Sequence, residues 1–127
     1  MRRLAALLIA ASPCAYAAEL PQALTADEIR SAVVGRSLAF PVNRSGISAT
    51  LLVDADGTGS ALLRNLRAQN RTPTGHPLYW RITEQHQLCT RIDKVQPREF
   101  CSQLRRNEDG SYTRFRGERV YSTFSTT

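Results

Sequence analysis

Apolar and polar residues alternate along several short segments of this chain, and turn residues separate these segments. In residues 47–53 every second side chain is apolar, namely Ile47, Ala49, Leu51 and Val53. Successive side chains of a strand point to opposite faces, so this alternation predicts a strand with one buried face. Residues 78–83 show the same pattern around Trp80, which is therefore predicted to lie in the core rather than on a ligand-binding surface.

Turn signals recur along the chain and delimit further strands. Asp-Gly pairs at positions 56–57 and 109–110 favour tight hairpin turns. The predicted strands are residues 37–42, 47–53, 58–66, 78–83, 88–92, 100–105, 111–116 and 120–124. Residues 67–77 are polar and contain prolines and a glycine, so they predict a long connecting loop. The pattern favours a mainly β fold, an antiparallel meander that forms a small barrel or sandwich of about seven to eight strands.

A short helix is predicted before the first strand. Thr25 and Glu28 have the spacing of a capping box, in which each side chain accepts a hydrogen bond from the other residue's backbone N–H. The helix is expected to cover residues 26–34 and to end at Gly35, which suits a C-terminal cap. Its apolar residues share one face, namely Ile29, Ala32 and Val33. A helix this short is unstable alone in water, so we expect it to pack against the strands.

The N-terminus has the three parts of a secretory signal peptide. They are a basic start at residues 1–3, an apolar run at residues 4–11 and the small-residue pattern Ala15-Tyr16-Ala17. This predicts a leader over residues 1–18, cleaved near Ala17 or Ala18, and a single β-rich domain over residues 19–127. The apolar run is shorter than the roughly 20 residues of a transmembrane helix, and no later segment reaches that length. We therefore expect a periplasmic or secreted protein.

The cysteines fit an oxidising compartment. Cys14 falls within the leader, and Pro13 precedes it, whereas lipid-modification signals need a small residue at that position. Cleavage would leave Cys89 and Cys101, which the alternation places on the same outward side of adjacent strands, close enough to bridge. These two residues are therefore predicted to form a disulfide.

Arginine dominates the positive charge. The formal net charge is +6, and loss of Arg2 and Arg3 with the leader would lower it to +4. Lys94 is the one lysine among 17 basic residues, a bias that favours a bacterial protein from a GC-rich genome. The charge is modest and an exported protein rarely meets nucleic acid, so we expect no nucleic-acid partner.

Four residues of the C-terminal third are candidates for partner binding. They are predicted to point outward from neighbouring strands, and they are Arg105, Tyr112, Arg114 and Arg116. The planar guanidinium group binds carboxylates and phosphates through paired hydrogen bonds, so this face would suit an acidic protein or an anionic envelope component. The alternative is an ordinary solvated sheet face that has no partner.

Catalytic, metal and cofactor patterns are not found in the sequence. His76, His86 and the cysteines lack the paired spacing of zinc ligands, and an oxidising compartment would consume the thiols. Both histidines fall in predicted turns, where solvent exposure is the simplest expectation. The segment Gly57-Thr58-Gly59-Ser60 differs from the G-x-S-x-G nucleophile motif. We therefore expect a protein that is not an enzyme and that holds no metal or cofactor.

A capped helix precedes a β-meander that carries a tryptophan strand and two cysteines. The segments in question are Trp80-Arg81-Ile82, Gln87-Leu88-Cys89, Phe100-Cys101 and Asp109-Gly110. In this order, over residues 24–115, the chain resembles a class of small exported bacterial envelope proteins of unknown function. The resemblance implies an envelope protein with a disulfide, and it implies no activity.

Three functions are compatible with these observations. The first is a non-enzymatic periplasmic binding or inhibitor module that uses the arginine-rich sheet face, the loop at residues 67–77, or both. The second is a small lipocalin-like carrier of an apolar ligand, which requires a cavity inside the barrel. A core filled by aromatic residues would exclude the carrier, and the candidates for such filling are Trp80, Phe100, Phe115 and Phe124. The third is an immunity protein that neutralises a toxin with an acidic surface.

Overall fold

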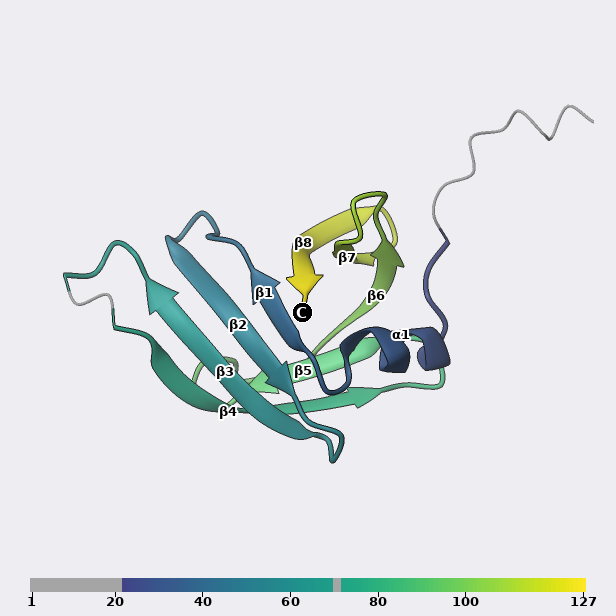
Figure 1. Cartoon of the computed structure of the whole chain (residues 1–127), viewed down its shortest axis with the longest axis horizontal. Helices are drawn as coiled ribbons and strands as arrows, with labels where there is room; N and C mark the ends of the chain where they lie inside the picture. The colour runs from purple at the N-terminus through teal and green to yellow at the C-terminus, as the bar shows by residue number, and fades with distance from the viewer. Residues whose placement is uncertain (1–21, 70–71) are drawn as a thin grey trace, which may run out of the picture.

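The strands close into a barrel in which neighbours in sequence are neighbours in space (Figure 1). The computed structural model describes residues 22–69 and 72–127, and within them it has one helix and eight strands. The elements are α1 (Ala26–Val33), β1 (Ser37–Phe40), β2 (Ile47–Val53), β3 (Thr58–Asn65), β4 (Thr74–Ile82), β5 (Leu88–Ile92), β6 (Phe100–Arg106), β7 (Tyr112–Arg116) and β8 (Arg119–Thr126). The predicted mainly β fold is confirmed as a barrel rather than a sandwich. The predicted leader lies outside the described residues.

The barrel is antiparallel throughout and is closed by pairing of the last strand with the first. Leu38 of β1 faces Thr126 of β8, and Ala39 faces Ser125. Alternation fills the interior as predicted for β2, where Leu51 and Val53 are buried while Leu52 between them is exposed. Each of the eight strands in the described residues therefore has a neighbour on both sides, unlike the edge strands of an open sheet.

Helix α1 covers one end of the barrel, as its amphipathic pattern predicts. The capping box is present, because Thr25 Oγ1 accepts from the backbone N–H of Glu28 and Glu28 Oε1 accepts from that of Thr25. Ile29 and Val33 are fully buried among the inward residues of the strands. The chain leaves the helix through Gly35, whose φ of 75° lies in the left-handed region that favours glycine.

Within the described ranges, α1 is too short to cross a membrane and no other helix could do so.

Backbone hydrogen bonds attach α1 and the residues that flank it to the barrel. The N–H of Leu24 donates to the carbonyl of Leu104 over 2.7 Å, and that of Gly35 donates to the carbonyl of Val53 over 2.7 Å. His86 Nδ1, in the turn between β4 and β5, accepts from the backbone N–H of Ala26 over 2.8 Å.

Trp80 is buried in the core and connects β4 to the hairpin of β2 and β3. Its indole Nε1 lies 2.8 Å from the carbonyl oxygen of Asp54 and 2.9 Å from that of Thr58. Its backbone N–H donates to the carbonyl of Gly57 over 3.0 Å. A buried indole N–H needs an acceptor. These bonds therefore fix the position of the Asp-Gly turn as well as that of the ring.

The predicted disulfide joins Cys89 of β5 to Cys101 of β6, which face each other in the strand register. Both sulfur atoms lie on the outer side of the barrel, as the alternation predicted. Beside the disulfide, Arg81 donates through Nε and Nη2 to the two carboxylate oxygens of Glu99 over 2.8 and 2.7 Å. These hydrogen bonds lower the pKa of Glu99 below its ordinary value.

The predicted loop at residues 67–77 is wrong at its C-terminal end, because β4 begins at Thr74. Residues 74–77 pair with residues 60–63 of β3. Pro77 has no N–H to donate, and its carbonyl accepts from the backbone N–H of Asp93 over 2.9 Å. Within β3, Leu62 is 42% exposed, whereas Leu63 lines the pocket in the barrel interior.

Removal of the disulfide is predicted to destabilise the protein. The cysteines are separated by 12 positions in sequence, and opening a loop of this size should lower the free energy of unfolding by about 3 kcal/mol in the chain-entropy model. The double substitution Cys89→Ala and Cys101→Ala should show this loss in urea unfolding followed by tryptophan fluorescence. Reduced wild-type protein is the matched control, and equal unfolding midpoints for its oxidised and reduced forms would contradict the prediction.

Candidate functional site

A pocket of about 500 Å³ lies inside the barrel at the end opposite α1. The β1–β2, β5–β6 and β7–β8 connections lie at this end, whereas α1 packs at the end that carries the β2–β3, β4–β5 and β6–β7 turns. Most of its wall is apolar and comes from inward positions, including Phe40, Ala49, Leu51, Leu63, Ile92 and Phe100. The volume falls within the range of about 300–1,000 Å³ that is usual for small-molecule sites. The barrel is therefore hollow at one end.

Arg114 contributes the cation that lines this pocket, and its side chain is buried at 5% exposure. Its Nε donates to Ser102 Oγ over 2.6 Å, and its Nη1 donates to Thr90 Oγ1 over 3.1 Å. Nη2 donates to the carbonyl oxygens of Leu88 over 3.0 Å and Phe100 over 3.3 Å. The guanidinium group is thus held by β5 and β6 from a position on β7.

The charge of Arg114 is not neutralised by any carboxylate in the described part of the chain. The ion pairs found there are Arg81 with Glu99 and Arg91 with Asp93. The residues that line the pocket include neither aspartate nor glutamate. Burial lowers the pKa of Arg114 to about 10, so the group still carries its positive charge at neutral pH. A buried ion without a partner costs several kcal/mol of desolvation.

Aromatic rings and a second arginine lie between Arg114 and the rim of the barrel. The Phe100 ring centroid is 4.7 Å from Arg114 Cζ, and the Tyr121 ring meets Phe100 edge to face at 4.8 Å. Arg116 lies over both rings, at 5.8 Å from Phe100 and 5.9 Å from Tyr121, and it donates to the carbonyl of Cys101. The mouth of the pocket therefore combines apolar surface with positive charge.

The predicted common outward orientation of Arg105, Tyr112, Arg114 and Arg116 is wrong, because these four residues do not share one side of the sheet. Leu104 is buried inside the barrel and faces Arg114 across the β6–β7 pair, so Arg114 also points inward. Tyr112 is buried as well, and its ring stacks on Phe124 at 5.5 Å.

Arg105 and Arg116 occupy different places. Arg105 is half-buried on the outer side, where its guanidinium carbon lies 5.2 Å from the Phe115 ring. Phe115 was predicted to point inward. It instead lies on the outer side, because the β6–β7 register places its neighbour Arg114 inside. Arg116 is exposed near the pocket mouth. These two arginines do not form one continuous face with Tyr112 and Arg114.

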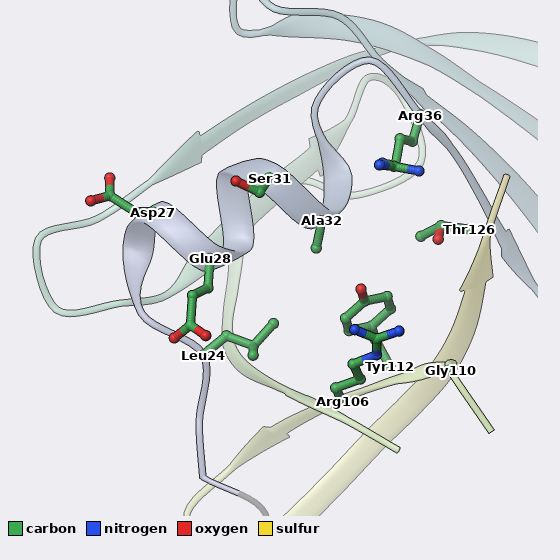
Figure 2. A pocket seen from close by; sticks show the side chains of 10 residues that line it. All are labelled: Leu24, Asp27, Glu28, Ser31, Ala32, Arg36, Arg106, Gly110, Tyr112 and Thr126. Carbon is green, nitrogen blue, oxygen red and sulfur yellow. The ribbon is translucent and has the colours of Figure 1, made fainter. Parts of the chain in front are cut away.

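A second hollow, of about 580 Å³, lies between α1 and the barrel end that it covers. Figure 2 shows Arg106 and Tyr112 on the barrel side facing the helix, while Asp27 points away from them. Glu28 also lines this hollow, but its carboxylate accepts the backbone N–H of Thr25, which lowers the pKa of Glu28. Acidic and basic groups are mixed here, so the hollow does not select one ligand charge.

The possible metal ligands are already engaged in other contacts. In the described ranges, one group of potential metal ligands has its ligand atoms within 4.8 Å of one another. It consists of Cys89, Glu99 and Cys101. Its two sulfur atoms are joined in the disulfide, and Glu99 is paired with Arg81. His86 lies in a turn and is exposed, as expected, and its Nδ1 also accepts a hydrogen bond from the backbone N–H of Ala26.

His76 was expected in a turn and instead lies in β4. Its Nε2 is 3.2 Å from Thr74 Oγ1.

Comparisons of the chain with protein-family models, with curated proteins and with solved structures found no match. The hollow barrel end and the buried guanidinium group are therefore the basis for a functional proposal.

Loss of the Ser102 hydroxyl is predicted to destabilise the folded protein. Ser102→Ala would leave the buried Arg114 Nε–H without its acceptor, which should lower the free energy of unfolding by about 1.5–3 kcal/mol. Urea unfolding of the oxidised protein measures this change. Ser60→Ala, an exposed position on β3, is the matched control and should change stability by less than about 0.5 kcal/mol. Equal effects of the two substitutions would contradict a role for the Ser102–Arg114 bond.

Proposed function

We propose that this protein is a non-enzymatic binding protein that holds a small, largely apolar ligand in the open end of its barrel. The observation that carries the proposal is the apolar-lined pocket of about 500 Å³. Burial of an apolar ligand against such walls removes surface from water and favours binding. The function is that of a carrier or reversible binding module, in which the bound molecule is not changed.

The distribution of aromatic side chains supports a hollow rather than a solid barrel. Trp80 and Phe124 are buried in the core. Phe115 lies outside, and Phe100 forms part of the pocket wall. The four aromatic residues that might have filled the interior are therefore divided between three environments, which leaves space for a ligand.

The rim of the pocket also suits entry of an apolar molecule. Val42 and Val95 line the pocket from two different loops, and their exposed fractions are 50% and 43%. Apolar side chains gathered at an opening can contact a ligand before it reaches the interior. The opening is formed by loops, which generally tolerate movement better than strands do.

An inhibitor or immunity function has weaker support. It would rely on a continuous arginine-rich face, yet Tyr112 and Arg114 are buried and Arg105 is half-buried against Phe115. The leader pattern and the disulfide support export to the periplasm or the cell exterior. We therefore place the binding function in that compartment.

Filling the pocket is predicted to weaken binding of an apolar molecule. Ala49 on β2 lines the pocket, and an indole ring introduced by Ala49→Trp would occupy space that a ligand needs. The neutral dye N-phenyl-1-naphthylamine gains fluorescence in apolar surroundings and serves as the probe. Its affinity for the variant should fall by about tenfold or more, which corresponds to loss of about 1.4 kcal/mol of apolar contact.

The matched control for this test is Leu52→Trp. Leu52 lies on the same strand, on the outer side of the barrel, so the added ring cannot enter the pocket. This variant should bind the dye as the wild-type protein does. Failure of the wild-type protein to bind the dye, or an equal loss in both variants with their barrels intact by circular dichroism, would overturn the proposed function.

A further inference from the structure

Arg114 has a hydrogen-bond donor left over for a ligand. A guanidinium group has five N–H donors. Four of them are directed to Ser102, Thr90 and the carbonyls of Leu88 and Phe100. Among the described residues, the second N–H of Nη1 meets no acceptor, although the side chain is 5% exposed and lines the pocket. Such a group is satisfied when an acceptor enters the pocket.

The charge of the pocket specifies what that acceptor should be. Among the described residues, the wall contains one cation and no acidic residue, and opposite charges attract strongly where water is excluded. A singly charged anion would neutralise Arg114. A doubly charged phosphate would leave a net negative charge in apolar surroundings, and a neutral ligand would leave the cation uncompensated.

The guanidinium group is also fixed in place before a ligand arrives. Acceptors on β5 and β6 hold three of its atoms, and the Phe100 ring covers it at 4.7 Å. A binding group that is already ordered loses little conformational entropy on association. Two uncharged hydrogen-bonding side chains could link these strands without burying a charge, so structural linkage alone does not account for an arginine here.

Positive charge at the rim would favour the approach of an anion. Arg116 and Arg119 are exposed, and Arg119 Cζ lies 5.1 Å from the Tyr121 ring, which is itself part of the pocket wall. Charges of one sign around an opening raise the local concentration and the association rate of an oppositely charged ligand. Glu118 lies between these two arginines in the turn, so this part of the mouth keeps an excess of positive charge, the sign of Arg114 inside the pocket.

We infer that the ligand is an amphipathic monocarboxylate whose carboxylate pairs with Arg114 while its apolar body packs against the pocket wall. This inference rests on the proposed binding function, and it adds the chemical class of the ligand and the residue that recognises it. A molecule of this class has one negative charge, an acceptor oxygen for the remaining N–H of Nη1 and an apolar remainder.

Octanoate and octan-1-ol provide matched probes, because they share a chain length and differ in charge. Each is titrated against the protein with bound N-phenyl-1-naphthylamine at neutral pH. Octanoate should displace the dye at a concentration about tenfold or more below that needed for octan-1-ol, as expected for a charge-assisted hydrogen bond. Arg114→Met should remove this preference and still bind octan-1-ol, whereas Arg114→Lys, which keeps the charge, should retain part of it.

Arg105→Met is the matched control, since it makes the same substitution on the outer side of the barrel. It should keep the full preference for octanoate. Equal binding of octanoate and octan-1-ol by the wild-type protein would overturn the inference while leaving the proposed function intact. Absence of binding for the dye and for both probes would overturn the proposed function itself.

A measurement on the wild-type protein alone covers the case in which Arg114→Met does not fold. When pH falls through the ionisation range of octanoic acid, the probe loses its charge, and the preference over octan-1-ol should disappear. Octan-1-ol has no ionisable group and should bind equally across that range. A preference for octanoate that survives protonation of the probe would show that it does not come from pairing with Arg114.

Discussion

Closure of the barrel by β8 and β1 is the constraint on which the rest of the structure depends. It rests on the facing pairs Leu38 with Thr126 and Ala39 with Ser125, and on mutual backbone bonds between Ser37 and Thr127 of 3.3 and 3.1 Å. A closed barrel of this strand number has an interior just wide enough either to be filled by side chains or to hold one small ligand. In this protein, side chains fill the interior at the α1 end, and a pocket of about 500 Å³ remains at the other.

The difference between the two ends follows from what covers each of them. At one end, Ile29 and Val33 of α1 complete a core that includes Trp80, Leu104 and Phe124. At the other end no helix of the described residues packs, and the inward positions include Ala49 and Thr90, which leave the space that larger side chains would fill. Arg114 belongs to this open end, while Tyr112, the preceding inward residue of β7, belongs to the helix end. The buried charge therefore lies where the filled half meets the hollow half.

Local sequence signals were sufficient for most of the fold. Three confirmed features depend only on neighbours in sequence or on one adjacent strand. They are the capping box at Thr25, the alternation in residues 47–53 and the facing positions of Cys89 and Cys101. The start of β4 was missed because prolines and a glycine usually end strands. Pairing with β3 and the hydrogen bond accepted by Pro77 stabilise an extended chain there, and neither interaction can be found from local sequence.

The site was harder to predict because hydrophobic patterning assumes that arginine is exposed. In β7, that assumption placed Phe115 inside and Arg114 outside, whereas the register set by Leu104 places them the other way. One signal was present in the sequence: Ser102 and Thr90 fall on the predicted inward sides of two adjacent strands, and buried hydroxyl groups require partners. The neighbouring strand β7 supplies that partner, the guanidinium group of Arg114. The four hydrogen bonds that this group donates compensate part of the cost of removing its charge from water. Polar residues on an inward face therefore indicate a buried donor even when the alternation of the next strand argues against one.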